Sequence, residues 1–305
     1  MLKMYHRHAE AGGSAAYWEE FGGHATLADR IRFLDVDPLR PLFQRYLKPG
    51  SRMLEGGCGR GQYVAYYAAR GARVVGLDFA REWLSALRRE GPALALCAGD
   101  VGALPFGSGT FDLYYSGGVV EHFESGPQRA LAEARRVIKD DGVLLISVPY
   151  FSPMRRLLAA LGRKEWHRVG QPQVDEAPGG RRFYQYAFSV PEFTRLLAGA
   201  GFRVLGTQGY ALVWGLTEVG LLRRVLERLD RMRGAGERPP GGEGGTRGRP
   251  ASAGRDSGAP RIRLLKKILV AEDASVPGAG WLIKWSRWAH ANMMMFVCAP
   301  DARRS

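Results

Sequence analysis

The chain has 305 residues, of which 46% are hydrophobic and 24% charged, and a formal net charge of +14. This composition is ordinary for a globular protein with one large core, and it excludes a disordered or fibrous chain. No apolar run approaches the roughly 18 residues of a membrane-spanning helix, and residues 1–10 lack the apolar centre of a signal peptide.

The cysteines and histidines give no sign of a metal site. Cys58, Cys97 and Cys298 are scattered without metal-ligand spacing, and His6 and His8 have no further ligands near them in the sequence. We therefore expect no metal. Free cysteines without a secretion signal favour a reducing, cytoplasmic location.

The positive charge is concentrated toward the end of the chain. Residues 221–305 contain 17 Lys/Arg and 8 Asp/Glu, so they carry +9 of the total +14. A basic excess favours nucleic acid, anionic lipid or acidic substrates as partners. A general bias of the chain toward arginine explains the charge equally well.

Strands and helices alternate through the first half of the chain. Residues 14–48 predict one or two helices, punctuated by Pro38 and Pro41. Beyond them, strands are expected at 52–55, 73–77, 93–98, 111–116 and 143–149, helices at 62–70, 81–90 and 128–138, and a turn at 140–142. This alternation predicts an α/β fold with a parallel sheet covered on both faces.

The pattern loosens after Pro149. Residues 150–186 are basic and aromatic without clear periodicity, whereas 189–200 predicts a helix with Ser189 and Glu192 at capping-box spacing. A strand is expected at 202–207, basic amphipathic segments at 215–233 and 261–271, and the last strand at 292–298. Gly and Pro make up 11 of the 24 residues of 237–260, which predicts disorder.

These elements divide the chain into four expected parts. They are an N-terminal helical cap (1–46), a ligand-binding core (47–209), a basic amphipathic insertion (210–290), and the last strand with the tail (291–305).

A glycine-rich loop follows the first core strand. Glu55 precedes glycines at every second position, namely Gly57, Gly59 and Gly61. The dinucleotide fingerprint Gly-x-Gly-x-x-Gly requires a different spacing, and position 62 is Gln. The acid inside the loop points to a ligand with an amino-acid end instead of a pyrophosphate.

Two further acids lie where strands end. Asp78 ends the second strand and Asp100 follows the third. Ligands of open parallel sheets bind beyond the carboxyl ends of the strands. A carboxylate in the first position suits a ribose diol, and one in the second suits an adenine amino group. Taken alone, an Asp at the end of a strand is usually a turn or capping residue.

The ordered set of motifs resembles the class I S-adenosylmethionine-dependent methyltransferases, in the broad group that includes ubiquinone-biosynthesis-like small-molecule enzymes. The resemblance covers about residues 47–149. It rests on the glycine loop, Asp78, Gly99-Asp100-Val101, Val119-Val120-Glu121-His122 and the run from Arg136 to Gly142. It implies a Rossmann-like, mostly parallel seven-stranded sheet with an antiparallel last strand, and S-adenosylmethionine as cofactor.

The resemblance also implies roles for individual residues. Glycine-loop groups around Gly57 and Gly59 would face the methionine part, as would Ser116 and Gly117. Asp78 would hold the ribose with Phe79 beside the adenine, while Asp100 and the Val101 backbone N–H would meet the adenine. The cofactor-binding candidates are therefore Glu55, Gly57, Gly59, Gly61, Asp78, Phe79, Asp100, Val101, Ser116 and Gly117.

His122 is the candidate general base, because an imidazole titrates near neutral pH. It could equally line the site or serve a structural role. Aromatic residues from the N-terminal helices and from the segment after residue 149 are expected to line the acceptor pocket. They are Tyr17, Trp18, Phe21, Tyr150, Phe151, Phe183, Tyr184 and Tyr186.

Three tryptophans, Trp281, Trp285 and Trp288, share one face of a predicted helix beside Lys284 and Arg287. Together with 215–233, residues 281–289 could contact a membrane surface. These faces could instead cover the sheet, lid the pocket or contact a partner protein.

The expected function is methyl transfer to a small-molecule or lipid-like acceptor. Nucleic acid is a less favoured acceptor, because Ser116-Gly117-Gly118-Val119 stands where base-amino methyltransferases carry Asn-Pro-Pro-Tyr. A non-catalytic protein that binds S-adenosylmethionine is the other alternative.

Overall fold

A computed structural model describes residues 1–6, 26–91, 93–161, 166–168, 182–212, 272 and 280–302. The predicted segments 215–233, 237–260 and 261–271 lie outside these residues, as do Tyr17, Trp18 and Phe21. Among the described residues, no helix is long and apolar enough to cross a membrane.

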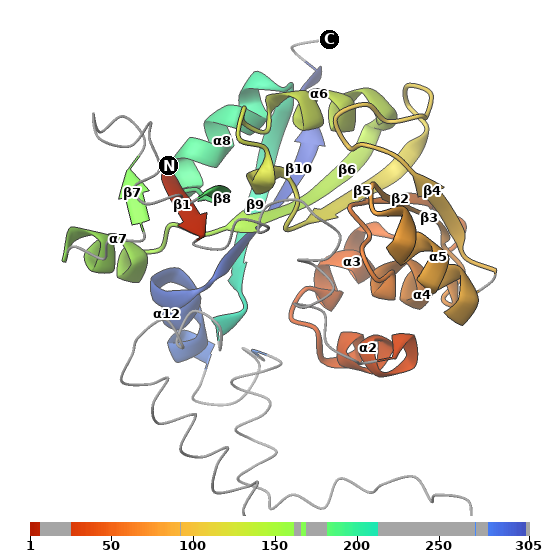
Figure 1. The fold of residues 1–305 in the computed structure, drawn as a ribbon, viewed down its shortest axis with the longest axis horizontal. Helices are drawn as coiled ribbons and strands as arrows, with labels where there is room; N and C mark the ends of the chain where they lie inside the picture. Colours follow the sequence, from red (N-terminus) through yellow and green to blue (C-terminus); the bar gives the residue numbers. More distant parts are fainter. Residues whose placement is uncertain are drawn as a thin grey trace, which may run out of the picture.

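A seven-stranded sheet forms the centre of the molecule (Figure 1). Its order is β4-β3-β2-β5-β6-β10-β9, and β10 runs antiparallel to both of its neighbours. The strands are β2 (Arg52–Gly56), β3 (Arg73–Asp78), β4 (Ala95–Ala98), β5 (Phe111–Gly117), β6 (Ile138–Pro149), β9 (Phe202–Tyr210) and β10 (Met293–Pro300). The predicted Rossmann-like sheet with an antiparallel last strand is confirmed.

Helices cover both faces of this sheet (Figure 1). One face carries α3 (Arg40–Tyr46) and α4 (Gln62–Ala68), and the other carries α6 (Gln128–Val137) and α8 (Val190–Gly199). A hydrophobic core lies on each face of the sheet, and alternate residues of β6 contribute to the two cores. Leu145 packs with Phe43 and Val64 in one core, whereas Leu144 packs with Leu131 in the other. The period-two alternation of a strand buried on both faces explains the near-continuous apolar run of β6.

The remaining helices lie at the sheet margins. They are α2 (Leu27–Phe33), the 3-10 turns η1 (Leu34–Val36) and η2 (Val120–His122), α5 (Arg81–Glu90), α7 (Pro153–Ala160) and α12 (Gly280–His290). The predicted capping box of α8 is confirmed, because the Ser189 side chain accepts from the helix backbone and Glu192 accepts from the Ser189 N–H. It fixes the start of the helix that covers β9.

Two expectations need correction. The turn predicted at 140–142 lies inside β6: Ile138 stands opposite Phe111 and Val143 opposite Leu113, so the intervening residues bulge out of register. At Gly142 a Cβ would lie 3.1 Å from the Asp112 carbonyl oxygen, so the bulge needs a glycine there. The residues typical of a turn are therefore accommodated by a β-bulge.

The second correction concerns a small sheet that the sequence did not predict. Strand β1 (Leu2–His6) lies between β7 (Trp166–Arg168) and β8 (Arg182–Ala187), antiparallel to both. Only helices were expected ahead of the core, and residues 150–186 showed no periodicity. The partners are short and far apart in the chain, so local pattern does not reveal them.

Candidate functional site

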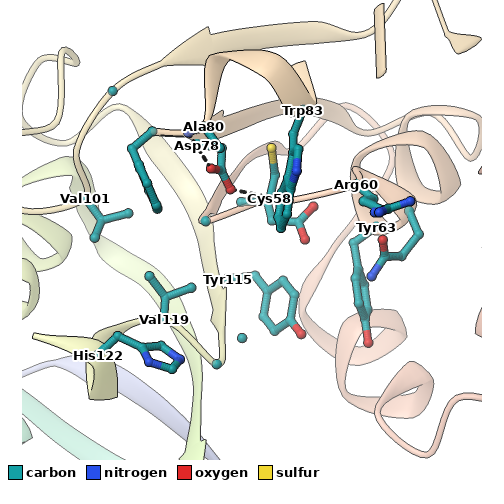
Figure 2. Close-up of a pocket in the computed structure, with 18 of the residues that line it drawn as sticks. Cys58, Arg60, Tyr63, Asp78, Ala80, Trp83, Val101, Tyr115, Val119 and His122 are labelled. Atoms are coloured by element: carbon teal, nitrogen blue, oxygen red, sulfur yellow. Dashed lines mark hydrogen bonds between the residues drawn. The ribbon is translucent and has the colours of Figure 1, made fainter. Parts of the chain in front are cut away.

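A pocket of about 660 Å³ opens at the carboxyl ends of β2, β3 and β5 (Figure 2). This volume is within the usual range of small-molecule sites, about 300–1,000 Å³. Its walls are Arg30, Glu55, Gly57, Cys58, Gly59, Arg60, Gln62, Tyr63, Asp78, Phe79, Ala80, Trp83, Gly99, Asp100, Val101, Tyr115, Gly117, Gly118, Val119, His122 and Phe123. The set includes His122 and all the predicted cofactor-binding residues except Gly61 and Ser116.

The glycine loop closes one side of the pocket. Gly57, Gly59 and Gly61 have φ angles of +77°, +49° and +67°, which L-residues with a side chain rarely adopt. A Cβ on Gly57 would lie 2.3 Å from Val119 Cγ2 across the pocket wall. Gly61 instead begins α4, and a Cβ there would meet Leu87 Cδ2 at 2.2 Å. Gly57 thus permits close approach at the pocket, whereas Gly61 permits helix packing.

Asp78 ties the glycine loop to the end of β3. One carboxylate oxygen accepts from the Gly59 N–H at 2.7 Å, and the other accepts from the Ala80 N–H at 2.9 Å (Figure 2). Burial raises the pKa of Asp78, while the backbone N–H groups of Ala80, Gly59 and Phe79 oppose the shift. The carboxylate therefore holds the loop in shape and still faces the pocket.

Glu55 is a buried acid on the same wall. Its side chain lies in β2, and burial raises its pKa well above the usual range, although the Val64 backbone N–H opposes this. Its Oε2 atom accepts no hydrogen bond from the residues the structure describes. A buried carboxyl oxygen without a donor is costly, so the position suits a ligand that donates to it.

The third acid lies on a more open part of the wall. Asp100 is exposed and accepts the Gly102 N–H at 2.8 Å, while the neighbouring Val101 is buried. Phe79 is 57% exposed although it is aromatic, so one ring face remains available in the pocket. These side chains form an apolar slot with a carboxylate at its edge.

Strand β5 supplies the wall next to His122. Gly117 lines the pocket, whereas Ser116 is buried beneath it, with an Oγ that has no partner among the described residues. The alternation of side chains along a strand sends Ser116 to the far side of β5 from its neighbour. The structure therefore places only one of these two residues at the pocket.

His122 stands at the opposite end of the pocket from Arg60 and Tyr63 (Figure 2). Its Nδ1 atom lies 2.8 Å from the Tyr184 carbonyl oxygen, which can only accept, so Nδ1 carries the proton. In the neutral ring the basic lone pair is then on Nε2. Burial lowers the pKa of His122, although the Tyr184 hydrogen bond opposes the shift.

Several lining residues were not predicted. Arg30 comes from α2, Tyr63 from α4 and Trp83 from α5, and their inward direction depends on how each helix packs. The Arg60 guanidinium lies 5.9 Å from the centre of the Trp83 ring. The helical periodicity of the sequence predicts only that Arg30, Tyr63 and Trp83 belong to amphipathic helices, and it does not predict that they face the pocket. Tyr115 could have been found, because it shares a strand with Gly117.

The aromatic wall expected from residues 150–186 is not part of this pocket. Tyr150, Phe151 and Tyr186 are buried in the hydrophobic core instead, and Phe183 packs against it. Tyr184 contributes through its backbone, by holding His122. The aromatic residues predicted in this segment therefore belong to the hydrophobic core or, in the case of Tyr184, hold His122 in place.

Known proteins give independent information about this pocket. A family model described as "Methyltransferase domain" matches residues 54–146, which contain the glycine loop, Asp78, Asp100 and His122. The match thus includes every element that surrounds the pocket except those of the N-terminal helices.

Two curated relatives extend the similarity. A malonyl-[acyl-carrier protein] O-methyltransferase of Erwinia pyrifoliae is 31% identical over 203 residues, 61% of this chain and 74% of that protein. A demethylmenaquinone methyltransferase of Renibacterium salmoninarum is 37% identical over 110 residues, which cover 35% of this chain and only 46% of the relative. The first match covers more than half of this chain and the second about a third.

A solved structure, the PH0226 protein from Pyrococcus horikoshii, has the same fold. It superposes with a TM-score of 0.51 at 22% identity, over 65% of this chain and 95% of that one. At this level of identity the likeness shows a shared fold and nothing about the activity.

Proposed function

Because the chain belongs to the class I S-adenosylmethionine-dependent methyltransferases, with S-adenosylmethionine as cofactor, we propose that it methylates a small-molecule or lipid-like acceptor bound beside His122. The observation that carries this proposal is the imidazole at one end of the pocket, fixed through Nδ1 to the Tyr184 carbonyl with its basic nitrogen at Nε2.

The pocket residues fit this cofactor. When bound, the cofactor supplies a methyl group already activated on a sulfonium. Glu55 Oε2, buried without a donor among the described residues, would accept from the ammonium of its methionine part. Asp78 would accept from the ribose hydroxyls with its remaining lone pairs, and the glycine at position 57 leaves room for close approach. Phe79, Asp100 and Val101 would hold the adenine.

Two arginines add positive charge to the wall of the pocket. Arg30 and Arg60 both line it. Burial lowers the pKa of Arg30; the Glu90 carboxylate, 3.8 Å from the Arg30 guanidinium, raises it, whereas Arg60 lowers it to a smaller extent. An anionic carboxylate at this side of the pocket would be attracted by both guanidinium groups. We assign it to the carboxylate of the methionine part.

The chain's own contribution to the transfer is alignment and proton removal. Methyl transfer needs the acceptor atom in line with the methyl group, which the walls of the pocket would enforce. An acceptor with a hydroxyl or amine also has to lose a proton, and His122 Nε2 would take it. A lowered pKa keeps the imidazole neutral, and therefore basic, at neutral pH.

Replacing His122 tests this role. We expect His122→Ala to reduce kcat by about 10²–10⁴-fold, the usual contribution of a general base, while the Kd for S-adenosylmethionine stays nearly unchanged. In the wild type, kcat/KM should fall as the pH drops below the lowered pKa, because the imidazole becomes protonated. An active variant with the wild-type pH profile would remove His122 from catalysis.

The acceptor itself is sought with labelled cofactor. Extract separated into lipid, small-molecule and RNA fractions is incubated with the protein and methyl-labelled S-adenosylmethionine, and incorporation into each fraction is counted. We expect label in the first or second fraction. Label confined to RNA, or cofactor binding with no transfer to any fraction, would overturn the proposed acceptor class.

A further inference from the structure

Helix α12 turns its tryptophans outward. Trp281, Trp285 and Trp288 are 68%, 51% and 58% exposed, and Leu282 beside them is also exposed. Indole rings normally contribute large buried areas in folded proteins, so three exposed rings on one helix face are unusual. Their spacing alone leaves open whether they cover the sheet, and their exposure excludes that alternative.

Buried side chains and hydrogen bonds of α12 fix this orientation. Ile283 and Ala289 are buried against the rest of the molecule. The Arg287 guanidinium donates to the side chain of Glu272 at 3.1 Å and to its carbonyl at 2.8 Å, and Glu272 accepts the Leu212 N–H at 2.9 Å. The helix is thus attached to the end of β9 through a buried acid, and rotation to hide the tryptophans would break these bonds.

Helix α7 packs beside α12 and also carries exposed apolar side chains (Figure 1 shows the two helices). The buried Arg155 donates to the carbonyls of Tyr150 and Asn292, at 2.9 and 3.1 Å, which joins α7 to the ends of β6 and β10. Leu157 and Leu161, at the far end of α7, are 55% and 74% exposed. We call the six residues Leu157, Leu161, Trp281, Leu282, Trp285 and Trp288 the tryptophan face.

The charged residues of the two helices that carry the tryptophan face are all basic. Neither α7 nor α12 contains an Asp or Glu, and Arg156 and Lys284 are exposed beside the apolar side chains. An apolar centre with a basic margin complements an anionic lipid surface, into whose interfacial region indole rings partition. It complements a second copy of this chain poorly, because the two basic margins would repel.

The tryptophan face and the pocket lie at the same end of the sheet, where the parallel strands have their carboxyl ends. Helix α7 follows the carboxyl end of β6, and α12 precedes β10, whose Met293 pairs with Pro149 at that same end. The pocket opens at the carboxyl ends of β2, β3 and β5, which run parallel to β6. When the tryptophan face lies against a surface, the pocket is therefore on the side of the molecule that is turned toward that surface.

We propose that the tryptophan face docks this protein on the surface of an anionic lipid bilayer. The tryptophan rings and leucines enter the interfacial region, while Lys284 and Arg156 contact lipid phosphates. The docking stands independently of methyl transfer. Only its consequence, that the acceptor is a lipid-like molecule drawn from the bilayer, rests on the proposed function.

The test is cosedimentation of the full chain with vesicles of phosphatidylcholine, with and without phosphatidylserine. We expect binding to the phosphatidylserine vesicles that weakens as salt rises. Trp281→Ser/Trp285→Ser/Trp288→Ser should abolish it, and Lys284→Gln should weaken it roughly fivefold, from about 1 kcal/mol per basic residue near the surface. Leu205→Ser, a change at an exposed apolar residue of β9, is the matched control and should bind normally.

Tryptophan fluorescence distinguishes insertion into lipid from self-association of the chain. Lipids brominated on the acyl chain should quench the wild type, and the quenching should be lost in the triple variant. S-adenosylmethionine titration without lipid, with an unchanged Kd, shows that each variant is folded and keeps the two proposals distinct. Undiminished vesicle binding by the triple variant overturns the docking. So does concentration-dependent dimerisation that the variant abolishes, or shielding of the rings from acrylamide without lipid.

Discussion

Asp78 illustrates how one side chain can serve the fold and the site together. Both of its oxygens accept backbone N–H groups, from Gly59 and Ala80, so the carboxylate shapes the loop before any ligand arrives. A side chain with one acceptor and one donor cannot satisfy this arrangement, since its NH₂ would face an N–H. The sequence predicted the acid at the strand end, but not that it also supports the glycine loop.

Asp78→Asn should therefore be nearly as damaging as Asp78→Ala. We expect each to weaken S-adenosylmethionine binding at least about tenfold, because a hydrogen bond to a charged group contributes roughly 1.5–3 kcal/mol. Isothermal titration measures the effect. If Asp78→Asn bound like the wild type, the ribose assignment and the loop-support argument would both be wrong.

Glu121 is a second buried acid whose ionisation the fold opposes. It is 1% exposed in η2, its Oε2 has no partner among the described residues, and burial raises its pKa to about 8. The ordinary value is 4.5, so between pH 4.5 and about 8 the folded chain keeps a proton that the unfolded chain has released. Stability from this group is present below pH 4.5 and is lost as the pH rises to about 8.

Glu121→Gln should remove that loss. Relative to the wild type, the variant should gain up to about 1.4 kcal/mol per pH unit across this window and no more above it. Urea unfolding at pH 5, 7 and 9 provides the comparison, with the exposed change Asp141→Asn as control. A stability difference independent of pH would show that Glu121 ionises in the folded protein as it does in the unfolded chain.

Among the elements, the glycine loop was the most predictable part of the site. Its residues lie close together in the sequence, and their spacing reflects backbone angles that only glycine adopts easily. The helices α2, α4 and α5 were predictable as helices, but Arg30, Tyr63 and Trp83 reach the pocket through tertiary packing. In the same way, the spacing of Trp281, Trp285 and Trp288 predicted a shared face, whereas its outward direction depends on Arg287 and Glu272.

Gly57→Ala tests whether Gly57 is needed for close approach to the pocket or only for the backbone conformation of the loop. Gly50 has a nearly equal φ, +80° against +77°, but a Cβ there meets nothing within 4 Å. Gly50→Ala should therefore lose only the roughly 1–2 kcal/mol of left-handed strain, with normal cofactor binding. Gly57→Ala should add the contact with Val119 and abolish binding in a titration. Equal cofactor affinity in the two variants would limit the role of Gly57 to backbone conformation.

At the scale of the whole molecule, a parallel sheet covered on both faces was predictable because it follows from alternating strands and helices, whereas the order of its strands was not predicted. The bulge in β6 and the small sheet of β1, β7 and β8 were not predictable, since their contacts join distant or irregular segments. The pocket depends on both loops and helices, so ligand binding should be linked to the stability of the domain as a whole.

Saturating cofactor should accordingly stabilise the folded chain. At a concentration of about 100 times Kd, S-adenosylmethionine should raise the free energy of unfolding by about 2.7 kcal/mol. Urea unfolding with and without the cofactor measures this gain, which should be much smaller at the same concentration for Asp78→Ala. A full gain in that variant would mean that the cofactor binds away from Asp78.

The central position of β1 has a consequence for how the chain folds. β7 and β8 do not pair with each other, and Leu2 of β1 stands opposite Arg168 on one side and Ala187 on the other. The strand that leaves the ribosome before its neighbours must therefore wait until they have been synthesised, and closing so long a loop is entropically costly. We expect this sheet to assemble late, after strands β2 to β6 of the seven-stranded sheet have paired.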